Sequence, residues 1–425
     1  MRFHRCLRRA HLSALVCLMT LVGVGADVRI GRASSLDDLI PGLYGGSLPT
    51  TTNPGFAPPE GQPLQFGRQF KSLSGALAAA RSQAPVPSAS GAFRFGWDSE
   101  LDTFVRSDQS LGSMFAERAQ TLGRRTGTFS VAYTRVDYGS FEGTSLNHLT
   151  FSQPAVSPDQ LSGLPPSDQA KYGNDLLRTR LNLGLSYDLL FLTAAFGVTD
   201  TIDVGMALSI NHAHMNGSAV TTIENPDGTP GNSFFALNAQ GQLDAPSGQV
   251  CAGALLPTCA SDGFSESVWG TGDLFLRGKW HFYDTPYVDL ATVATLTLPT
   301  GNASDFLGFY DPTFTPLLVA SKSFGLVAPH LNLGYSFRSG KDVSQALWVV
   351  GADVRATRWL TLFSDFLGFH DDKRDGINDD VYQSALGFKV NPIDRFVLGA
   401  GFQFPLNDAG IRADVIYTTQ IEYTF

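Results

Sequence analysis

The sequence lacks a hydrophobic run long enough to cross a membrane as a helix. Such a helix needs about 20 consecutive apolar residues, and the longest apolar stretch, residues 12–24, is shorter. It follows the arginines of residues 1–9 and ends at Gly25-Ala26, which is the pattern of a secretory signal peptide. We therefore expect residues 1–26 to be removed on export, and the mature chain to contain no membrane-spanning helix.

Cysteine and positive charge are also scarce. Of four cysteines, Cys6 and Cys17 lie in the signal peptide, and only Cys251 and Cys259 remain. In an oxidising compartment we expect these two to form one disulfide, and they are too few for a metal site. The formal net charge is −9, and it becomes about −13 once the four arginines of the signal peptide are removed. This acidic balance argues against a nucleic-acid partner.

What the chain has instead is strict alternation, most clearly in residues 415–425. One face carries Val415, Tyr417, Ile421, Tyr423 and Phe425, and the other face is mostly polar. A two-residue period of this kind fits a strand between lipid and water, and a half-buried terminal strand of a soluble sheet is the alternative. A final Tyr423-Thr424-Phe425 resembles the assembly signal of outer-membrane β-barrels, so we expect the barrel-assembly machinery to be a partner.

From residue 181 onward, alternating stretches of about ten to sixteen residues are joined by connections that are short and long in turn. The short connections are Val198-Thr199-Asp200, Asp284-Thr285-Pro286, Phe324-Gly325, Ala356-Thr357 and Asn391-Pro392-Ile393. The long connections are residues 216–265, 299–312, 339–344, 370–379 and 405–412. This order is typical of a transmembrane barrel with tight periplasmic turns and longer outer loops.

The number of stretches predicts the architecture, an all-β antiparallel up-and-down transmembrane barrel over residues 91–425. Eleven stretches lie beyond residue 181, and residues 129–138 supply a twelfth. Residues 93–106 and 114–122 would supply two more. We therefore expect about 14 strands, with 12 as the alternative. An even number places both termini in the periplasm. Residues 27–90, rich in Pro, Gly and Ser, predict either a periplasmic extension or a plug in the lumen, with a short helix at residues 70–83.

Alternation also predicts which polar side chains face the lumen. An ionised side chain against lipid costs about 2–4 kcal/mol at mid-membrane, so polar positions between apolar ones should point inward. The residues predicted to line the pore are Asp203, Asn211, Asp273, Arg277, Lys279, His281, Asp353, Arg355, Arg395 and Gln403. These mixed charges either brace a polar interior or select a solute, and the sequence leaves both interpretations open.

No catalytic or cofactor motif stands out. His212 and His214 share a strand face but continue a lipid-facing row, so we interpret them as interfacial. The acidic residues 371–380 lack the ligand order of an EF-hand and predict an outer loop. We therefore expect that the protein is not an enzyme and that it binds no cofactor. The alternatives are an outer-membrane lipase or protease, which would need a partner for His281 or His330, and a structural or adhesive barrel.

Several motifs resemble a known family. They are GVTDTIDVGMAL at residues 197–208, GTGDLFLRGKWHF at 270–282, LTLPTGNASDFLG at 296–308, GLVAPHLNLGYSF at 325–337 and FAERAQTLGRR at 115–125. They are similar to the outer-membrane transporter family labelled meta-pathway of phenol degradation, over most of residues 35–425. The resemblance implies passive uptake of small hydrophobic or aromatic solutes across the outer membrane of a Gram-negative bacterium. We expect a monomer in contact with outer-membrane lipid and lipopolysaccharide.

Overall fold

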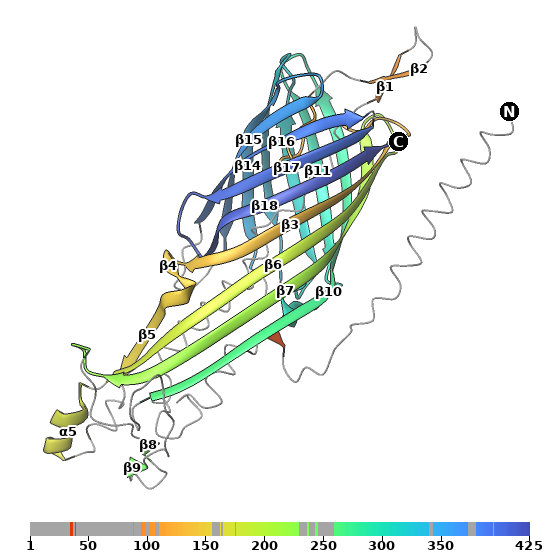
Figure 1. The fold of residues 1–425 in the computed structure, drawn as a ribbon. Coiled ribbons are helices and arrows are strands. Elements are labelled where there is room, and N and C mark those ends of the chain that lie inside the picture. The colour runs from red at the N-terminus through yellow and green to blue at the C-terminus, as the bar shows by residue number, and fades with distance from the viewer. Residues whose placement is uncertain are drawn as a thin grey trace. The chain divides into compact units, whose positions relative to one another are not determined.

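Twelve long antiparallel strands close into a barrel (Figure 1). The computed structural model describes residues 35, 36, 39, 88, 95–98, 103–106, 110–154, 162, 165–174, 176–228, 236–237, 243–244, 259–339, 343–372, 380–393 and 395–425. The wall strands are β3 (Gly127–Phe141), β6 (Leu176–Gly197), β7 (Ile202–Glu224), β10 (Cys259–Asp284), β11 (Asp289–Leu298), β12 (Thr313–Ser321), β13 (Val327–Ser336), β14 (Gln345–Arg355), β15 (Leu360–Asp371), β16 (Asp380–Ile393), β17 (Phe396–Pro405) and β18 (Ile411–Thr424). Each pairs with its neighbour along the chain, and β3 closes the ring by pairing with both β6 and β18.

The all-β barrel prediction is confirmed, with 14 strands in one sheet of which 12 close the ring. The two additional strands, β4 (Thr144–Ser145) and β5 (Leu149–Pro154), extend β3 and β6. They are not the two that the sequence predicted. Residues 93–106 instead contain a separate hairpin of β1 (Phe95–Asp98) and β2 (Thr103–Arg106), and residues 114–122 form no strand. Other short elements are β8 (Ala236–Leu237), β9 (Leu243–Asp244), α5 (Pro166–Tyr172), η3 (Leu146–His148) and η4 (Ala303–Asp305).

The predicted order of tight turns and long connections is also confirmed. Four of the five predicted turns join wall strands at the same end of the barrel as the carboxyl terminus (Figure 1). The fifth turn lies at that end too but comes later than predicted, because Asn391, Pro392 and Ile393 belong to β16 and the turn lies between Ile393 and Phe396. There Gly127 and Phe425 exchange backbone hydrogen bonds of 2.9 and 2.8 Å, which ties the first wall strand to the last residue. The connection predicted at residues 216–265 is shorter than expected, because β7 and β10 continue pairing as far as Thr222 and Cys259.

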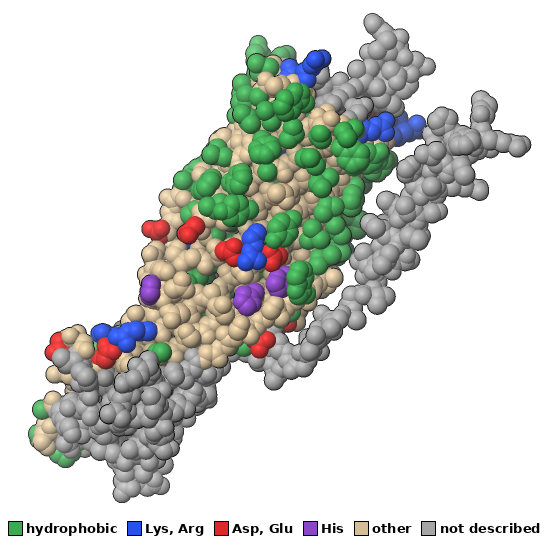
Figure 2. All heavy atoms as spheres, viewed as in Figure 1, with side chains coloured by type: hydrophobic (Ala, Val, Ile, Leu, Met, Phe, Trp, Pro, Cys, Tyr) green, Lys and Arg blue, Asp and Glu red, His purple; other side chains and the backbone are tan. Residues whose placement is uncertain are grey.

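The outer face of the wall changes from apolar to polar along its length. Near the tight turns it exposes large apolar side chains, among them Ile202, Val204 and Met206 on β7. Figure 2 shows this hydrophobic zone ending at a group of charged and histidine side chains. Among the polar side chains of the wall, Asp188 accepts a hydrogen bond from Arg135 at 2.9 Å and contacts His212 at 2.9 Å. An apolar band bordered by polar groups is what a lipid-embedded barrel requires. Within the described part of the chain, no helix is long and apolar enough to cross a membrane.

Candidate functional site: a chamber inside the barrel

A stretch of chain ahead of the first wall strand runs across the inside of the barrel. Residues 110–122, here called the inner segment, are buried throughout except for Gln120, which is partly buried. Their backbone N–H groups have no ladder partner, so side chains accept from them, as buried backbone donors require. Ser113 Oγ of the same segment accepts from Phe115 and Ala116, and wall side chains accept from four others. The acceptors are Thr361 Oγ1 for Leu111 at 2.9 Å, Asn332 Oδ1 for Glu117 at 2.7 Å, Ser321 Oγ for Ala119 at 2.9 Å and Asp203 Oδ2 for Leu122 at 3.0 Å.

Glu117 anchors the middle of the inner segment by charge. Its carboxylate contacts Arg277 Nη2 at 2.7 Å and Lys279 Nζ at 3.1 Å, and Ser88 Oγ donates to it at 2.8 Å. Lys279 Nζ also donates to the carbonyl oxygen of Arg118 at 2.9 Å. Two of the predicted inward cations of β10 are therefore engaged by an acidic side chain that arrives from another part of the chain. Such a buried group is costly to disturb, because removing one partner leaves the others unpaired.

Met114 and Phe115 hold the same segment by packing. They lie over wall positions without side chains: an added Cβ would come within 3.1 Å of Met114 Sδ at Gly399 and within 2.8 Å of the Phe115 ring at Gly401. The Phe115 ring also meets Phe363 edge-on, with 5.9 Å between centroids. The wall glycines thus make a hollow for these two large side chains, which explains why β17 carries them in mid-strand.

His330 is the buried histidine beneath this segment. Its Nε2 is 2.7 Å from Asp365 Oδ1, its Nδ1 is 3.9 Å from Asp353 Oδ1, and Ser113 Oγ donates to the other oxygen of Asp365. The carboxylate therefore lies between the hydroxyl and the imidazole. A nucleophile and its base must contact each other directly, so this trio does not form the Ser/His pair that an outer-membrane hydrolase would need.

The connection between β11 and β12, residues 299–312, folds inward from the other end and is here called the inward loop. Asp273 holds it by accepting from the backbone N–H groups of Gly301 at 3.0 Å and Phe309 at 2.8 Å. Asn211 Nδ2 donates to the carbonyl oxygen of Leu307 at 2.8 Å. Asp273 lies in the motif at residues 270–282, and Gly301 lies in the motif at residues 296–308. The hydrogen bond from Gly301 to Asp273 therefore joins the two motifs.

Close backbone contact explains the glycines of that junction. A Cβ on Gly301 would lie 2.7 Å from the Leu307 carbonyl oxygen and 3.0 Å from the Cα atoms of Gly272 and Gly308. Real Cβ atoms do not approach backbone so closely, so only glycine fits there. Beyond this contact, Phe306 and Leu307 pack in an apolar cluster with Leu36, Val136 and Tyr138.

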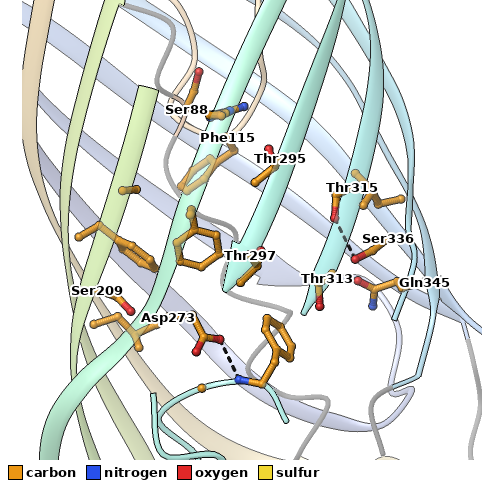
Figure 3. A pocket seen from close by; sticks show the side chains of 18 of the residues that line it. Ser88, Phe115, Ser209, Asp273, Thr295, Thr297, Thr313, Thr315, Ser336 and Gln345 are labelled. Carbon is orange, nitrogen blue, oxygen red and sulfur yellow. Dashed lines mark hydrogen bonds between the residues drawn. The ribbon is translucent and has the colours of Figure 1, made fainter. Parts of the chain in front are cut away.

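Between the inner segment and the inward loop lies a chamber of about 270 Å³. Aromatic and aliphatic side chains make up much of its wall: Phe115, Tyr138, Tyr187, Phe191, Phe275, Val293, Phe306, Phe309, Leu317, Val349, Leu367 and Phe369. Hydroxyl and amide side chains make up the remainder, and Figure 3 shows several of them around Thr297 and Thr313. Pockets for drug-sized ligands measure about 300–1,000 Å³, so this chamber suits one small, mostly apolar molecule.

The structure places most of the predicted pore-lining residues on the inner face. Asp203, Asn211, Asp273, Lys279, His281, Asp353 and Gln403 are buried there, and Arg277 and Arg355 are partly buried on inward positions. Arg395 is elsewhere: it is exposed in the turn before β17, with φ 70°, because the strand and its alternation begin only at Phe396. Of these residues, Asn211, Asp273 and Arg277 line the chamber. Whether the others line a conducting path stays a prediction.

The remaining predicted residues lie outside the chamber. Tyr423 is partly buried and Phe425 is exposed on the lipid-facing side, and their rings stack with 6.2 Å between centroids; their role in assembly stays a prediction. His212 stacks on Trp269 on the outer face at 4.2 Å, and no group of three or more potential metal ligands occurs among the described residues. The side chains of Cys251 and Cys259, the signal peptide and nearly all of residues 27–90 are outside the described part.

Comparison with known proteins finds similarity at the level of structure only. No protein-family model matches the chain, and a comparison with curated protein sequences finds no match. Similar solved structures include an outer-membrane channel of Pseudomonas putida F1 (12% identity, covering 73% of this chain and 99% of that chain, TM-score 0.45). Others are the toluene transporter TbuX of Ralstonia pickettii (11%, 71% and 89%, TM-score 0.33) and the translocator domain of the autotransporter NalP of Neisseria meningitidis (7%, 71% and 88%, TM-score 0.33).

These similarities carry no argument about the solute, because every TM-score is below 0.5 and the proteins include both channels and an autotransporter domain. The resemblance to the meta-pathway family likewise stays a prediction.

Proposed function

We propose that the protein is an outer-membrane channel for the passive uptake of small hydrophobic or aromatic solutes. The observation that supports this most directly is the chamber, because it is lined largely by apolar and aromatic side chains inside a barrel with an apolar outer band. A wall that faces lipid outside and encloses an apolar cavity inside is suited to carrying a molecule that water disfavours.

In this proposal the inner segment closes the periplasmic end of the chamber and moves when solute passes. It is held by wall side chains at isolated positions, and none of its residues belongs to a strand. A segment anchored by separate contacts can leave the wall without breaking the barrel. The inward loop, joined to β11 and β12 at both its ends, stays as the outer wall of the chamber.

Uptake by lipid vesicles that contain the purified protein tests this function. Replacing Ala207, which lines the chamber, by Trp should fill part of it and reduce toluene uptake several-fold. The matched control is Ala194→Trp on β6, because Ala194 pairs with Met206 on the lipid-facing side of the wall. Equal toluene uptake by the wild type and Ala207→Trp, with both folded, would contradict a route through the chamber.

A further inference from the structure

The chamber contains buried polar atoms that have no hydrogen-bond partner among the residues that the structure describes. Thr313 is 2% exposed and its Oγ1 makes no hydrogen bond, and Asn211 is 6% exposed and its Oδ1 accepts none. Both residues line the chamber. A buried polar atom without a partner destabilises the protein, so a molecule that supplies a hydrogen bond at these positions binds more tightly than one that does not.

Several uncharged hydroxyl and amide side chains of the lining are gathered at one end of the chamber. Thr297 lies opposite Thr313 in the β11–β12 pairing, and Ser336 lies opposite Gln345 in the β13–β14 pairing. In Figure 3 these side chains lie on the side of the chamber where Asp273 holds Phe309 of the inward loop, whereas Phe115 of the inner segment lies further along. Val293 and Leu317, which pair with each other on β11 and β12, are closer to the tight-turn end. Uncharged hydroxyl and amide side chains therefore gather beside the inward loop, whereas the other end presents Phe115, Val293 and Leu317 together with the paired charges of Glu117 and Arg277.

The charged groups that line the chamber are engaged by the protein itself. Glu117 contacts Arg277 and Lys279, and Asp273 accepts from two backbone N–H groups. Arg338 donates to the Val343 carbonyl oxygen at 3.2 Å and lies 4.8 Å above the Phe309 ring. A charged solute would have to be desolvated without a counter-ion of its own, which is costly. The lining therefore favours an uncharged solute.

Building on the proposed function, we infer that the chamber selects an uncharged single-ring solute with one hydroxyl group, and binds it with the hydroxyl beside Thr313 and the ring toward Phe115. A hydroxyl both donates and accepts, so it can satisfy Thr313 Oγ1 or Asn211 Oδ1. The apolar ring then fills the end lined by Val293 and Leu317. A pure hydrocarbon of the same shape would fill the same space and leave the polar atoms unpaired.

Binding of paired probes to the purified full-length protein tests this inference. Benzyl alcohol should bind about tenfold more tightly than toluene, the ratio that one hydrogen bond of about 1.4 kcal/mol provides. Benzoate should bind more weakly than either. Cyclohexanol should also be preferred over methylcyclohexane, because the preference depends on the hydroxyl. Dissociation constants can be measured by calorimetry or by ligand-observed nuclear magnetic resonance.

The decisive variant is Thr313→Val, which keeps the shape and removes the hydroxyl. It should lower the preference for benzyl alcohol over toluene about tenfold and leave toluene binding unchanged. The matched control is Thr418→Val, because Thr418 is equally buried on the inner face but bonds to Thr134 at 3.0 Å and does not line the chamber. The control should keep the wild-type preference.

Three outcomes overturn the inference: equal binding of toluene and benzyl alcohol by the wild type, an unchanged preference in Thr313→Val, or the same loss in Thr418→Val. Should Thr313→Val fail to fold, Thr313→Ala, which also removes the hydroxyl, takes its place with the same expectation. Vesicle uptake separates this inference from the proposed function. If toluene is taken up without any preference for the hydroxyl, the proposed channel function is retained and the inferred selectivity is refuted. If neither solute binds or enters the vesicles, both the function and the selectivity are refuted.

Discussion

The inner segment and the inward loop both occupy the lumen, but they are held in different ways. The inner segment is anchored by charges and by wall side chains, with Glu117 between Arg277 and Lys279 at its centre. The inward loop is anchored by the buried carboxylate of Asp273, which accepts from the backbone N–H groups of the loop, and by glycines packed against each other. Charge pairs and single hydrogen bonds can be exchanged for water, whereas close backbone packing cannot. The comparison therefore indicates a movable closure at one end of the chamber and a fixed wall at the other.

The largest expected effect is on the inner segment. Glu117→Ala leaves Arg277 and Lys279 buried without their carboxylate, a change that costs about 3–5 kcal/mol at buried ion pairs. We expect the segment to leave the wall and single-channel conductance to rise. The control is Glu117→Ala combined with Arg277→Gln and Lys279→Gln, which removes the stranded charges and should restore part of the closure. Unchanged conductance in Glu117→Ala would show that the charges do not hold the segment.

The corresponding change at the inward loop is Asp273→Asn. The amide nitrogen of Asn cannot accept, so one of the two N–H groups, from Gly301 or Phe309, loses its partner at a cost of about 1–3 kcal/mol. We expect faster hydrogen exchange at these two amides and little change in conductance, because the glycine packing remains. Asp137→Asn, on the outer face, should leave the exchange as in the wild type. If Asp273→Asn raised the conductance as much as Glu117→Ala, the inward loop would be as movable as the inner segment.

A glycine-to-alanine substitution in each region compares the rigidity of the two. In Gly301→Ala the new Cβ meets the Leu307 carbonyl oxygen at 2.7 Å, and backbone cannot yield; in Gly401→Ala it meets the Phe115 ring at 2.8 Å, which can rotate. Overpacking of this kind costs about 1–3 kcal/mol. We expect Gly301→Ala at the upper end of that range and Gly401→Ala at the lower end, measured by thermal unfolding in detergent. The reverse order would mean that the inner segment is the more rigid of the two.

The smallest expected effect lies at the rim of the tight turns. The hydrogen bond from Lys322 to Asp289 raises the pKa of the Lys322 amine above its ordinary 10.5, and Asp289 in turn accepts from Gln120 of the inner segment. The ion pair is therefore complete below pH 10.5 and is lost as pH rises through the raised pKa. Exposed pairs contribute about 0–1 kcal/mol. Lys322→Met should lower the melting temperature slightly at pH 8 and not at pH 12; an equal loss at both would exclude the ion pair as its cause.

The sequence predicted the wall better than the contents of the lumen. Alternation identified the inward positions Asp203, Asp273 and Lys279, because the pleat of a strand depends only on local sequence. It did not reveal what those side chains bind, since Glu117 and Gly301 come from segments far away in the chain. Residues 114–122 were predicted to be a wall strand, and they form none. The adjacent charges Glu117 and Arg118 break the alternation, and they were the available signal that this stretch is not wall.

The extension of β6, β7 and β10 was missed for a similar reason. Beyond the apolar band their outer faces turn polar, so residues such as Asn216 and Ser218 resemble a loop in sequence. The inner faces stay apolar, with Leu181, Leu183 and Met215 buried in one cluster. Where a strand extends from the lipid into water, its outer side chains become polar while its inner side chains stay apolar. A prediction based on apolar outer side chains therefore ends the strand too early.

In the proposed channel, solute passes only when the inner segment moves. A disulfide that locks the segment to the wall tests this directly, in a chain where Cys251 and Cys259 are replaced by Ser. Cysteines at Ala119 and Ser321 are suited to this, because Ala119 N lies 2.9 Å from Ser321 Oγ. We expect toluene uptake into vesicles to stop in the oxidised protein and to return with a reductant, while the single-cysteine variants are unaffected. Undiminished uptake by the oxidised protein would contradict a movable inner segment.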